Sequence, residues 1–148
     1  MPLDLSLLLS RTVETELPLL LAIPESDAGT GNAGAWSRKQ ELGHLIDSAS
    51  NNHLRFVRAA LEAEFSGPSY DQKGCVNLHG YQEMNWSDLV EFWRQYNTLL
   101  ARVIARIPED KLNTPCRVAT DEPVTLQFLI TDYVGHMKHH LDHILRGS

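Results

Sequence analysis

Apolar residues recur at every third or fourth position in four long segments of the chain. The segments run from about Leu3 to Ile23, from Ser37 to about Phe65, from Asn85 or Ser87 to Ile107, and from just after Pro123 to about Leu145. This period is typical of helices that bury one face. The nearest approach to a strand, Arg117 to Thr120, is too short to matter. The pattern therefore predicts an all-α fold, a four-helix bundle.

Residues at the ends of these segments agree with the predicted helix boundaries. Ser37 is followed three residues later by Gln40, a pair typical of the capping box at a helix N-terminus. Pro18 is expected to kink the first helix or to split off its last turn. The glycine-containing stretch from Pro24 to Ala35 predicts a loop. The loop from Gly67 to Met84, about 18 residues, is longer than neighbouring antiparallel helices need, so we expect it to cross the bundle or cover a site.

Composition and charge narrow the class of protein. The chain has 148 residues, 43% of them hydrophobic and 22% charged, which predicts one globular domain over residues 1–148. A net charge of −6, without a basic block, argues against nucleic acid as a partner. Charged residues interrupt the first segment, so no membrane span is expected, and the first residues lack the positive leader of a signal peptide. Cys75 and Cys116 form no Cys-x-x-Cys pair, and a cytoplasmic protein is the expectation.

Histidine is the most informative residue type in the sequence. Four of the seven histidines lie within eight residues, in the run HMKHHLDH. Neutral imidazole binds divalent transition metals well, and two histidines four residues apart on a helix can bind one ion. The run offers two such pairs, His136 with His140 and His139 with His143. At about 100° per residue, the first pair borders the apolar face and the second points outward or to an edge, so His136 and His140 are the better candidates.

A metal site needs a third ligand, and His44 is the best placed candidate, within ELGHLID of the second helix. It lies in a polar stripe with Ser48 and Asn51, which could equally be a solvated face. The spacing also allows a plainer interpretation of the whole run, since histidines suit the C-terminal end of a helix dipole. His53 and His79 have no comparable support.

Three stretches of the sequence resemble one known family. Residues 36–57, WSRKQELGHLIDSASNNHLRFV, are similar to the second-helix signature of the DinB-like (YfiT-like) four-helix bundles, in which a Trp-Ser start precedes a Gly-His-Leu metal ligand. Residues 133–145, YVGHMKHHLDHIL, are similar to the fourth-helix His-x-x-His-His signature of that family. The connecting stretch is similar too, at residues 70–72, at 80–82 and from Trp86 onward. The resemblance covers nearly the whole chain, in the family's order.

The resemblance implies an up-down-down-up bundle that holds one divalent metal ion on His44 of the second helix and on His136 and His140 of the fourth. Zinc or nickel is the expected ion, and iron or manganese also suits the ligands. The last two residues are the pair that helical geometry selects independently. The sequence departs from the family after residues 71–72, where Lys73-Gly74-Cys75 replaces the aromatic residue that members often carry.

Three neutral histidines leave open positions on an ion, as in catalytic rather than structural sites. Water or a thiol bound there would be a nucleophile near neutral pH. Relatives in the superfamily include enzymes that use low-molecular-weight thiols, so the resemblance implies a thiol-dependent S-transferase or a hydrolase that acts on a small-molecule electrophile. The alternative is a helical bundle that binds a metal or another ligand without catalysis.

Two carboxylates could support the ligands by accepting the outer N–H of a ligand histidine. Asp132 lies four residues before His136, and Asp47 lies three residues after His44. Both could instead be exposed helix carboxylates. No Ser-His-Asp or Cys-His arrangement is supported by the sequence. A homodimer is compatible with a bundle of this kind, but the sequence gives no interface.

Overall fold

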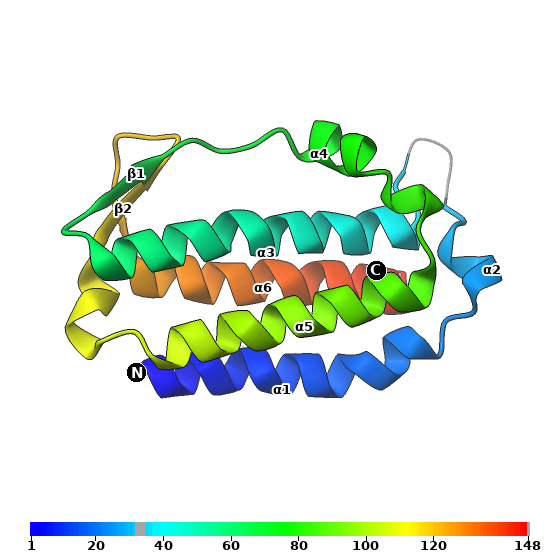
Figure 1. The fold of residues 1–148 in the computed structure, drawn as a ribbon, viewed down its shortest axis with the longest axis horizontal. Coiled ribbons are helices and arrows are strands. Elements are labelled where there is room, and N and C mark those ends of the chain that lie inside the picture. Colours follow the sequence, from blue (N-terminus) through cyan, green and yellow to red (C-terminus); the bar gives the residue numbers. More distant parts are fainter. Residues whose placement is uncertain (32–34, 148) are drawn as a thin grey trace.

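Four long helices make up most of the protein in a computed structural model that describes residues 1–31 and 35–147 (Figure 1). They are α1 (Pro2–Leu21), α3 (Arg38–Leu61), α5 (Trp86–Ala105) and α6 (Leu126–Arg146). α1 and α3 lie diagonally opposite each other, and each packs against both α5 and α6. α1 and α6 run in one direction and α3 and α5 in the other. The predicted four-helix bundle with up-down-down-up order is confirmed.

Side-chain caps determine where three of these helices begin. The Ser37 hydroxyl accepts a hydrogen bond from the Gln40 N–H, and the Gln40 side chain accepts one from the Ser37 N–H. This is the predicted capping box, which satisfies two N–H groups that a helix start would otherwise leave unpaired. Asn85 caps α5 and Thr125 caps α6 through their side-chain oxygens.

Two details of the N-terminal part differ from the predictions. The stretch predicted to be a loop contains a short helix, and Pro18 does not separate the last turn from α1. α1 continues through Pro18 to Leu21, because the proline removes a single N–H donor while its own carbonyl still accepts from the Ala22 N–H. The one-turn helix α2 (Glu25–Ala28) follows within the stretch predicted to be a loop. A second short element, η2 (Glu109–Asn113), leads away from α5 at the other end of the bundle.

A three-stranded sheet closes one end of the bundle, contrary to the expectation that no strand matters (Figure 1). β1 (Phe65–Gly67) pairs in parallel with β2 (Pro115–Val118), which pairs antiparallel with β3 (Val124–Thr125). The second predicted helix therefore ends at Leu61 and not near Phe65, because Phe65 belongs to β1. Strands of two to four residues are too short to show a period of two in the sequence.

The long connection between α3 and α5 crosses the bundle. This is one of the two arrangements that its length predicts. Because α3 and α5 run in the same direction, the chain has to return along α3 before α5 can begin (Figure 1). On the way it forms α4 (Gln72–His79) and the single turn η1 (Tyr81–Glu83). Gly80 joins them at φ 66°, in the left-handed region that favours glycine. We call residues 68–84 the crossover segment.

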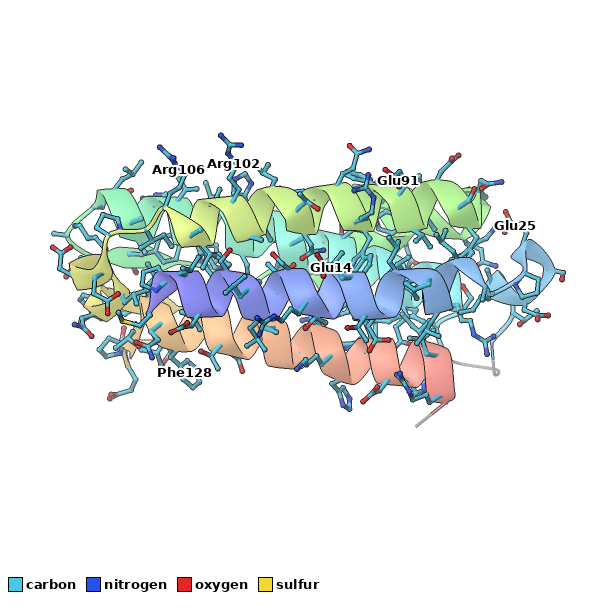
Figure 2. All side chains as sticks on the ribbon, turned by 90° about the horizontal axis from the view of Figure 1, so that it is seen from below. Glu14, Glu25, Glu91, Arg102, Arg106 and Phe128 are labelled. Carbon is cyan, nitrogen blue, oxygen red and sulfur yellow. The ribbon has the colours of Figure 1, made fainter. Side chains whose placement is uncertain are left out.

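The core lies between the four long helices, whose apolar stripes face inward. Charged side chains such as Glu14, Glu91 and Arg102 lie on the outside (Figure 2). None of the helices in the described part of the chain is long and apolar enough to cross a membrane. The largest fully buried side chains include Phe56, Trp93, Leu100, Ile130 and Met137.

Buried polar side chains gather on the first half of α3. Glu41, His44, Asp47 and Ser48 are each 5% exposed or less. Burying polar groups costs free energy unless they find partners. Packing of the bundle does not explain these four buried polar side chains. The first half of α3 is therefore the candidate location of a functional site.

Candidate metal centre

Three histidines from two antiparallel helices meet at one point. His44 comes from α3, and His136 and His140 come from consecutive turns of α6. One ring nitrogen from each lies within 4.8 Å of the other two. His44 is 1% exposed, whereas His136 and His140 are partly exposed. The structure thus brings together the three residues that the sequence analysis predicts as ligands.

The spacing of these nitrogens fits a shared ion. The Nε2 atoms of His44 and His136 are 3.4 Å apart. Hydrogen bonds from protein N–H groups span ~2.7–3.2 Å, so this contact is long for one. Two nitrogens that each lie about 2.0–2.1 Å from one tetrahedral zinc ion are themselves ~3.3 Å apart. The donor set and the separation of these two nitrogens are therefore compatible with a shared divalent metal ion.

The local environment favours the neutral form of two of the candidate ligands, His44 and His136. Burial lowers the pKa of His44 to about 4, and the nearby charges of protonated His140 and His136 act in the same direction. Burial also lowers the pKa of His136, and His140 adds to that effect. Neutral imidazole is the form that binds metal, so these two residues need not lose a proton first at neutral pH.

Glu41 supports the cluster from α3, one turn before His44. Its Oε2 lies 2.8 Å from Nδ1 of His140, and its Oε1 lies 2.6 Å from Nδ1 of His143. Burial raises the pKa of Glu41, but the hydrogen bonds to both histidines outweigh that effect and lower it. An ionised Glu41 holds the His140 proton on Nδ1 and leaves the Nε2 lone pair free for a metal. The sequence analysis missed this residue, although a carboxylate one turn from His44 was a usable signal.

Asp47, the second carboxylate predicted to support a ligand, has other partners in the structure. Its Oδ1 accepts a hydrogen bond from the Tyr81 hydroxyl at 2.7 Å and lies 2.8 Å from Nδ1 of His79. No hydrogen bond joins Asp47 to His44 in the described part of the chain, and Nδ1 of His44 is buried without a partner there. A residue three positions further along a helix points about 60° away, and this rotation directs Asp47 toward the crossover segment.

Asp132, the other predicted carboxylate, makes no hydrogen bond to His136 among the described residues. The Asp132 side chain is exposed, and its charge acts on His136 only by opposing the effect of burial on the pKa of that imidazole. His139 is exposed, as predicted from the helical angle. The carboxylate that contacts a candidate ligand is therefore Glu41.

Trp36 and the crossover segment border the cluster on two sides. The ring centroids of Trp36 and His44 are 4.9 Å apart. Next to His44, Gly43 lets the crossover segment approach closely, because a Cβ there would lie 2.1 Å from a ring carbon of Tyr81. Tyr70, also from the crossover segment, interacts with the side chain of Ser48. The crossover segment therefore packs on α3 on both sides of His44 in the sequence, at Gly43 and at Ser48.

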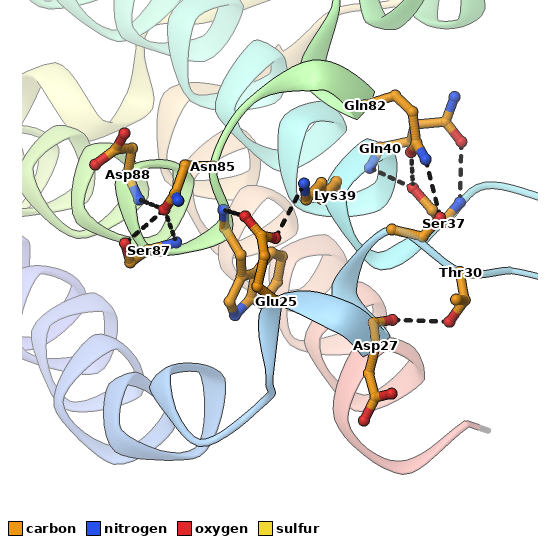
Figure 3. Close-up of polar contacts among 12 residues, drawn as sticks. Glu25, Asp27, Thr30, Ser37, Lys39, Gln40, Gln82, Asn85, Ser87 and Asp88 are labelled. Carbon is orange, nitrogen blue, oxygen red and sulfur yellow. Dashed lines mark hydrogen bonds and ion pairs between the residues drawn. The ribbon is translucent and has the colours of Figure 1, made fainter.

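A second set of polar contacts fixes the start of α3 (Figure 3). Ser37, besides capping the helix, donates a hydrogen bond to the Gln82 side chain. Glu25 pairs with Lys39 at 3.0 Å and accepts a hydrogen bond from the Trp86 N–H. These contacts tie α2, α3 and the end of the crossover segment together, so His44, two turns into α3, has a well-defined position.

The fold and the histidine cluster define a class of protein, a four-helix bundle that brings three histidines from two antiparallel helices to one centre. The chain belongs to the DinB superfamily, whose family model matches residues 8–144.

Two relatives have names that refer to metal. A protein of Bacillus pumilus (strain SAFR-032) named "Putative metal-dependent hydrolase" is 31% identical over 114 residues, which are 75% of this chain and 63% of that protein. "Putative metal-dependent hydrolase YfiT" of Bacillus subtilis (strain 168) is 24% identical over 116 residues, which are 78% of this chain and 65% of YfiT. The matches therefore span less than two thirds of the length of these curated relatives.

A solved structure is similar over nearly the whole chain. It is YfiT from Bacillus subtilis, described as "a probable metal-dependent hydrolase with an unusual four-helix bundle topology". The superposition has a TM-score of 0.84 at 21% sequence identity and covers 95% of this chain and 82% of the YfiT chain. At this identity the likeness shows the fold, and it agrees with the helix order described above.

Proposed function

We propose that His44, His136 and His140 hold one divalent metal ion, and that this centre activates a thiol or water nucleophile for attack on a small-molecule electrophile. The reaction is either transfer of a low-molecular-weight thiol to the electrophile or its hydrolysis. The observation that carries the proposal is the meeting of three imidazole nitrogens within 4.8 Å. The names of the two relatives, both of which refer to metal dependence, support it.

The residues around the centre have distinct roles in this proposal. Full burial of His44 and partial burial of His136 lower their pKa values and favour the neutral form. Glu41 orients His140 by holding its Nδ1 proton. Zinc or nickel is the ion that we expect, with iron or manganese as the next candidates, since three imidazoles suit all of them. A divalent ion on three neutral ligands supplies positive charge that lowers the pKa of a thiol or water toward neutrality.

Metal content tests the first half of the proposal. Protein without a histidine tag is loaded with zinc, desalted and analysed for bound metal. We expect about one ion per chain in the wild type and loss of that ion in His136→Ala. His139→Ala is the matched control, because His139 lies in the same run but is exposed, and it should retain the ion. Failure of the wild type to bind zinc, nickel or manganese would overturn the proposal.

Turnover tests the second half. Metal-loaded protein is mixed with glutathione and 1-chloro-2,4-dinitrobenzene to follow thiol transfer, and with p-nitrophenyl acetate to follow hydrolysis. We expect turnover that requires both the metal and His136. Stoichiometric metal without turnover on any electrophile in a wider screen would instead support a bundle that binds a metal or ligand without catalysis.

A further inference from the structure

A second polar cluster lies one turn further along α3, where the crossover segment packs on that helix. At its centre is Asp47, which is 3% exposed. The Tyr81 hydroxyl donates to Asp47 Oδ1 at 2.7 Å, and Nδ1 of His79 lies 2.8 Å from the same oxygen. The other oxygen, Oδ2, is buried and has no hydrogen-bond partner among the described residues. Packing alone does not account for a carboxylate in this position.

The partners of Asp47 offset part of its burial. Burial raises the pKa of Asp47, whereas the Tyr81 hydroxyl and the charge of a protonated His79 lower it. The Cys75 thiol and the Tyr70 hydroxyl belong to the same cluster, since their negative charges, when ionised, raise the pKa of Tyr81. His79 is therefore the residue of this cluster whose protonated form stabilises an ionised Asp47.

The geometry leaves one nitrogen of His79 available for chemistry. Its Nδ1 faces Asp47, so the proton belongs on Nδ1 and the lone pair on Nε2. The side chain is 50% exposed, and Nε2 makes no hydrogen bond to another described residue. The buried carboxylate and the half-exposed imidazole have the same relationship as the aspartate and histidine of a serine hydrolase, in which the carboxylate fixes the tautomer and stabilises the imidazolium.

This pair stands beside the candidate metal centre. Asp47 follows His44 by three residues on α3, which separates their Cβ atoms by about 5–6 Å. Tyr81, whose ring centroid is 5.3 Å from that of His79, packs on Gly43, the residue before His44. His79 thus contacts two residues, Asp47 and Tyr81, that lie next to His44 along α3 or pack beside it.

The proposed reaction needs a proton acceptor that the three histidines cannot provide. Their Nε2 lone pairs are required for the metal, and the Nδ1 proton of His140 is held by Glu41. We propose that His79 is this acceptor and that Asp47 is its positioning residue. The inference rests on the proposed function, and it names the residue through which the same site removes a proton.

The step balances without an added reagent. The S–H or O–H bond of the nucleophile breaks, its proton moves to Nε2 of His79, and its electron pair forms the new bond to the electrophilic atom. The leaving group departs with the electron pair of the bond that breaks. The imidazolium, stabilised by Asp47, then returns the proton to the leaving group or to water. His79 ends in its starting form.

The tautomer of His79 tests the geometry in metal-free protein, independently of activity. Nitrogen-15 NMR above pH 8 identifies which ring nitrogen carries the proton. We expect Nδ1 in the wild type and a shift toward Nε2 in Asp47→Ala. His53 is the internal reference, since its Nδ1 faces the Tyr96 hydroxyl and no carboxylate. A wild-type His79 with its proton on Nε2 would overturn the inference.

Activity of zinc-loaded protein on the two probe reactions tests the role. We expect His79→Gln to bind zinc as the wild type does and to lose about 10²-fold or more in kcat/KM, together with one ionisation of the pH profile. Asp47→Asn should lose less and keep the metal. Added imidazole should restore part of the activity of His79→Ala, which shows that this variant is folded. His53→Gln serves as the control and should behave as the wild type.

The outcomes separate this inference from the proposed function. If the wild type binds zinc and turns over the probes while His79→Gln keeps its kcat/KM within twofold, His79 is not the acceptor and the inference fails alone. If the wild type shows no turnover, the proposed function fails and the catalytic role of His79 fails with it. Loss of metal from His79→Gln would also contradict the inference, because it would make His79 a support of the metal centre.

Discussion

Glu41 on α3 accepts a hydrogen bond from Nδ1 of His140 on α6, at 2.8 Å, and this bond determines which nitrogen of the ring carries the proton. The carboxylate is buried and ionised, because its two histidine partners outweigh the effect of burial on its pKa. It lies in the first turn of α3, where the helix dipole also favours negative charge. Glu41 is thus an electrostatic link between the two helices that provide the candidate ligands.

Replacing Glu41 should weaken metal binding without removing any ligand. In Glu41→Gln the side chain keeps its size, but the charge that holds the His140 proton is lost. We expect zinc affinity to fall about 10- to 100-fold, as for other residues that orient a ligand. Competition with a chromophoric chelator measures the change. Glu14→Gln, on the exposed face of α1, should have the wild-type affinity, and an unchanged affinity in Glu41→Gln would contradict this role.

Gly43 should tolerate no side chain. A Cβ at this position would lie 2.1 Å from Tyr81, whereas the space around Gly135 on α6 is open to 4 Å. Gly43→Ala is therefore expected to destabilise the protein by about 1–3 kcal/mol through overpacking. Gly135→Ala should stabilise it by about 0.5–1 kcal/mol, because alanine is the better helix former. Urea unfolding compares the two variants, and a stabilised Gly43→Ala would mean that Tyr81 does not pack on α3.

Removing the cap of α3 should lower stability by a smaller amount. In Ser37→Ala the helix loses its capping box and the hydrogen bond to Gln82. The expected loss is about 1 kcal/mol, within the range for N-cap substitutions. Thermal unfolding of metal-free protein checks it. Ser10→Ala is the comparison, since Ser10 makes no side-chain hydrogen bond within the described residues, and equal effects of both changes would argue against the cap.

Metal-free protein should lose stability as the pH falls from about 6.5 toward 4. The folded-state pKa of His44 is about 4, below the value of about 6.5 in an unfolded chain. Between these values the unfolded chain binds a proton that the folded protein does not, so acidification favours unfolding, whereas above this window the contribution is constant. A shift of this size is worth about 3 kcal/mol. His136 acts in the same direction.

Urea unfolding in the presence of a chelator, at pH 7.5 and at pH 4.5, measures this dependence. The difference between the two pH values should be smaller in His44→Gln than in the wild type. His53→Gln should keep the full difference. If His44→Gln also shows the full stability difference between the two pH values, burial does not hold His44 neutral.

Helical periodicity selected His136 and His140 from the sequence. The resemblance to the DinB-like family implied His44, because its position on the second helix did not distinguish a ligand from a residue on a solvated face. His136 and His140 lie on consecutive turns at the border of the apolar face, and the structure places them there. Position along a helix did not indicate the partners of Asp47, because those partners depend on the segment that packs on α3. The partners of Asp47 are Tyr81 and His79, and both come from the crossover segment, which has no long periodic pattern.

Contacts between residues far apart in the sequence account for the other differences. Pairing of β1 with β2 joins Phe65 to Cys116, a relationship that no local pattern of so few residues carries. The hydrogen bond between Glu41 and His140 likewise joins residues far apart in the sequence, 99 positions from each other. The up-down-down-up order places α3 beside α6 and brings Glu41 within reach of His140. From the sequence alone, only Asp47 and Asp132 were considered for this supporting role.

α3 and α5 run in the same direction, so the crossover segment, residues 68–84, has to return along α3 outside the four long helices. α3 has 24 residues and is therefore ~36 Å long, and the chain must retrace that length on the outside of the bundle. Bundles joined by tight hairpins contain no such returning segment. Here exposed positions of residues 68–84 can change while the packed interior stays as it is. Substitutions at these exposed positions are therefore a route by which the surroundings of α3 could change while the buried contacts of Val76 and Tyr81 are kept.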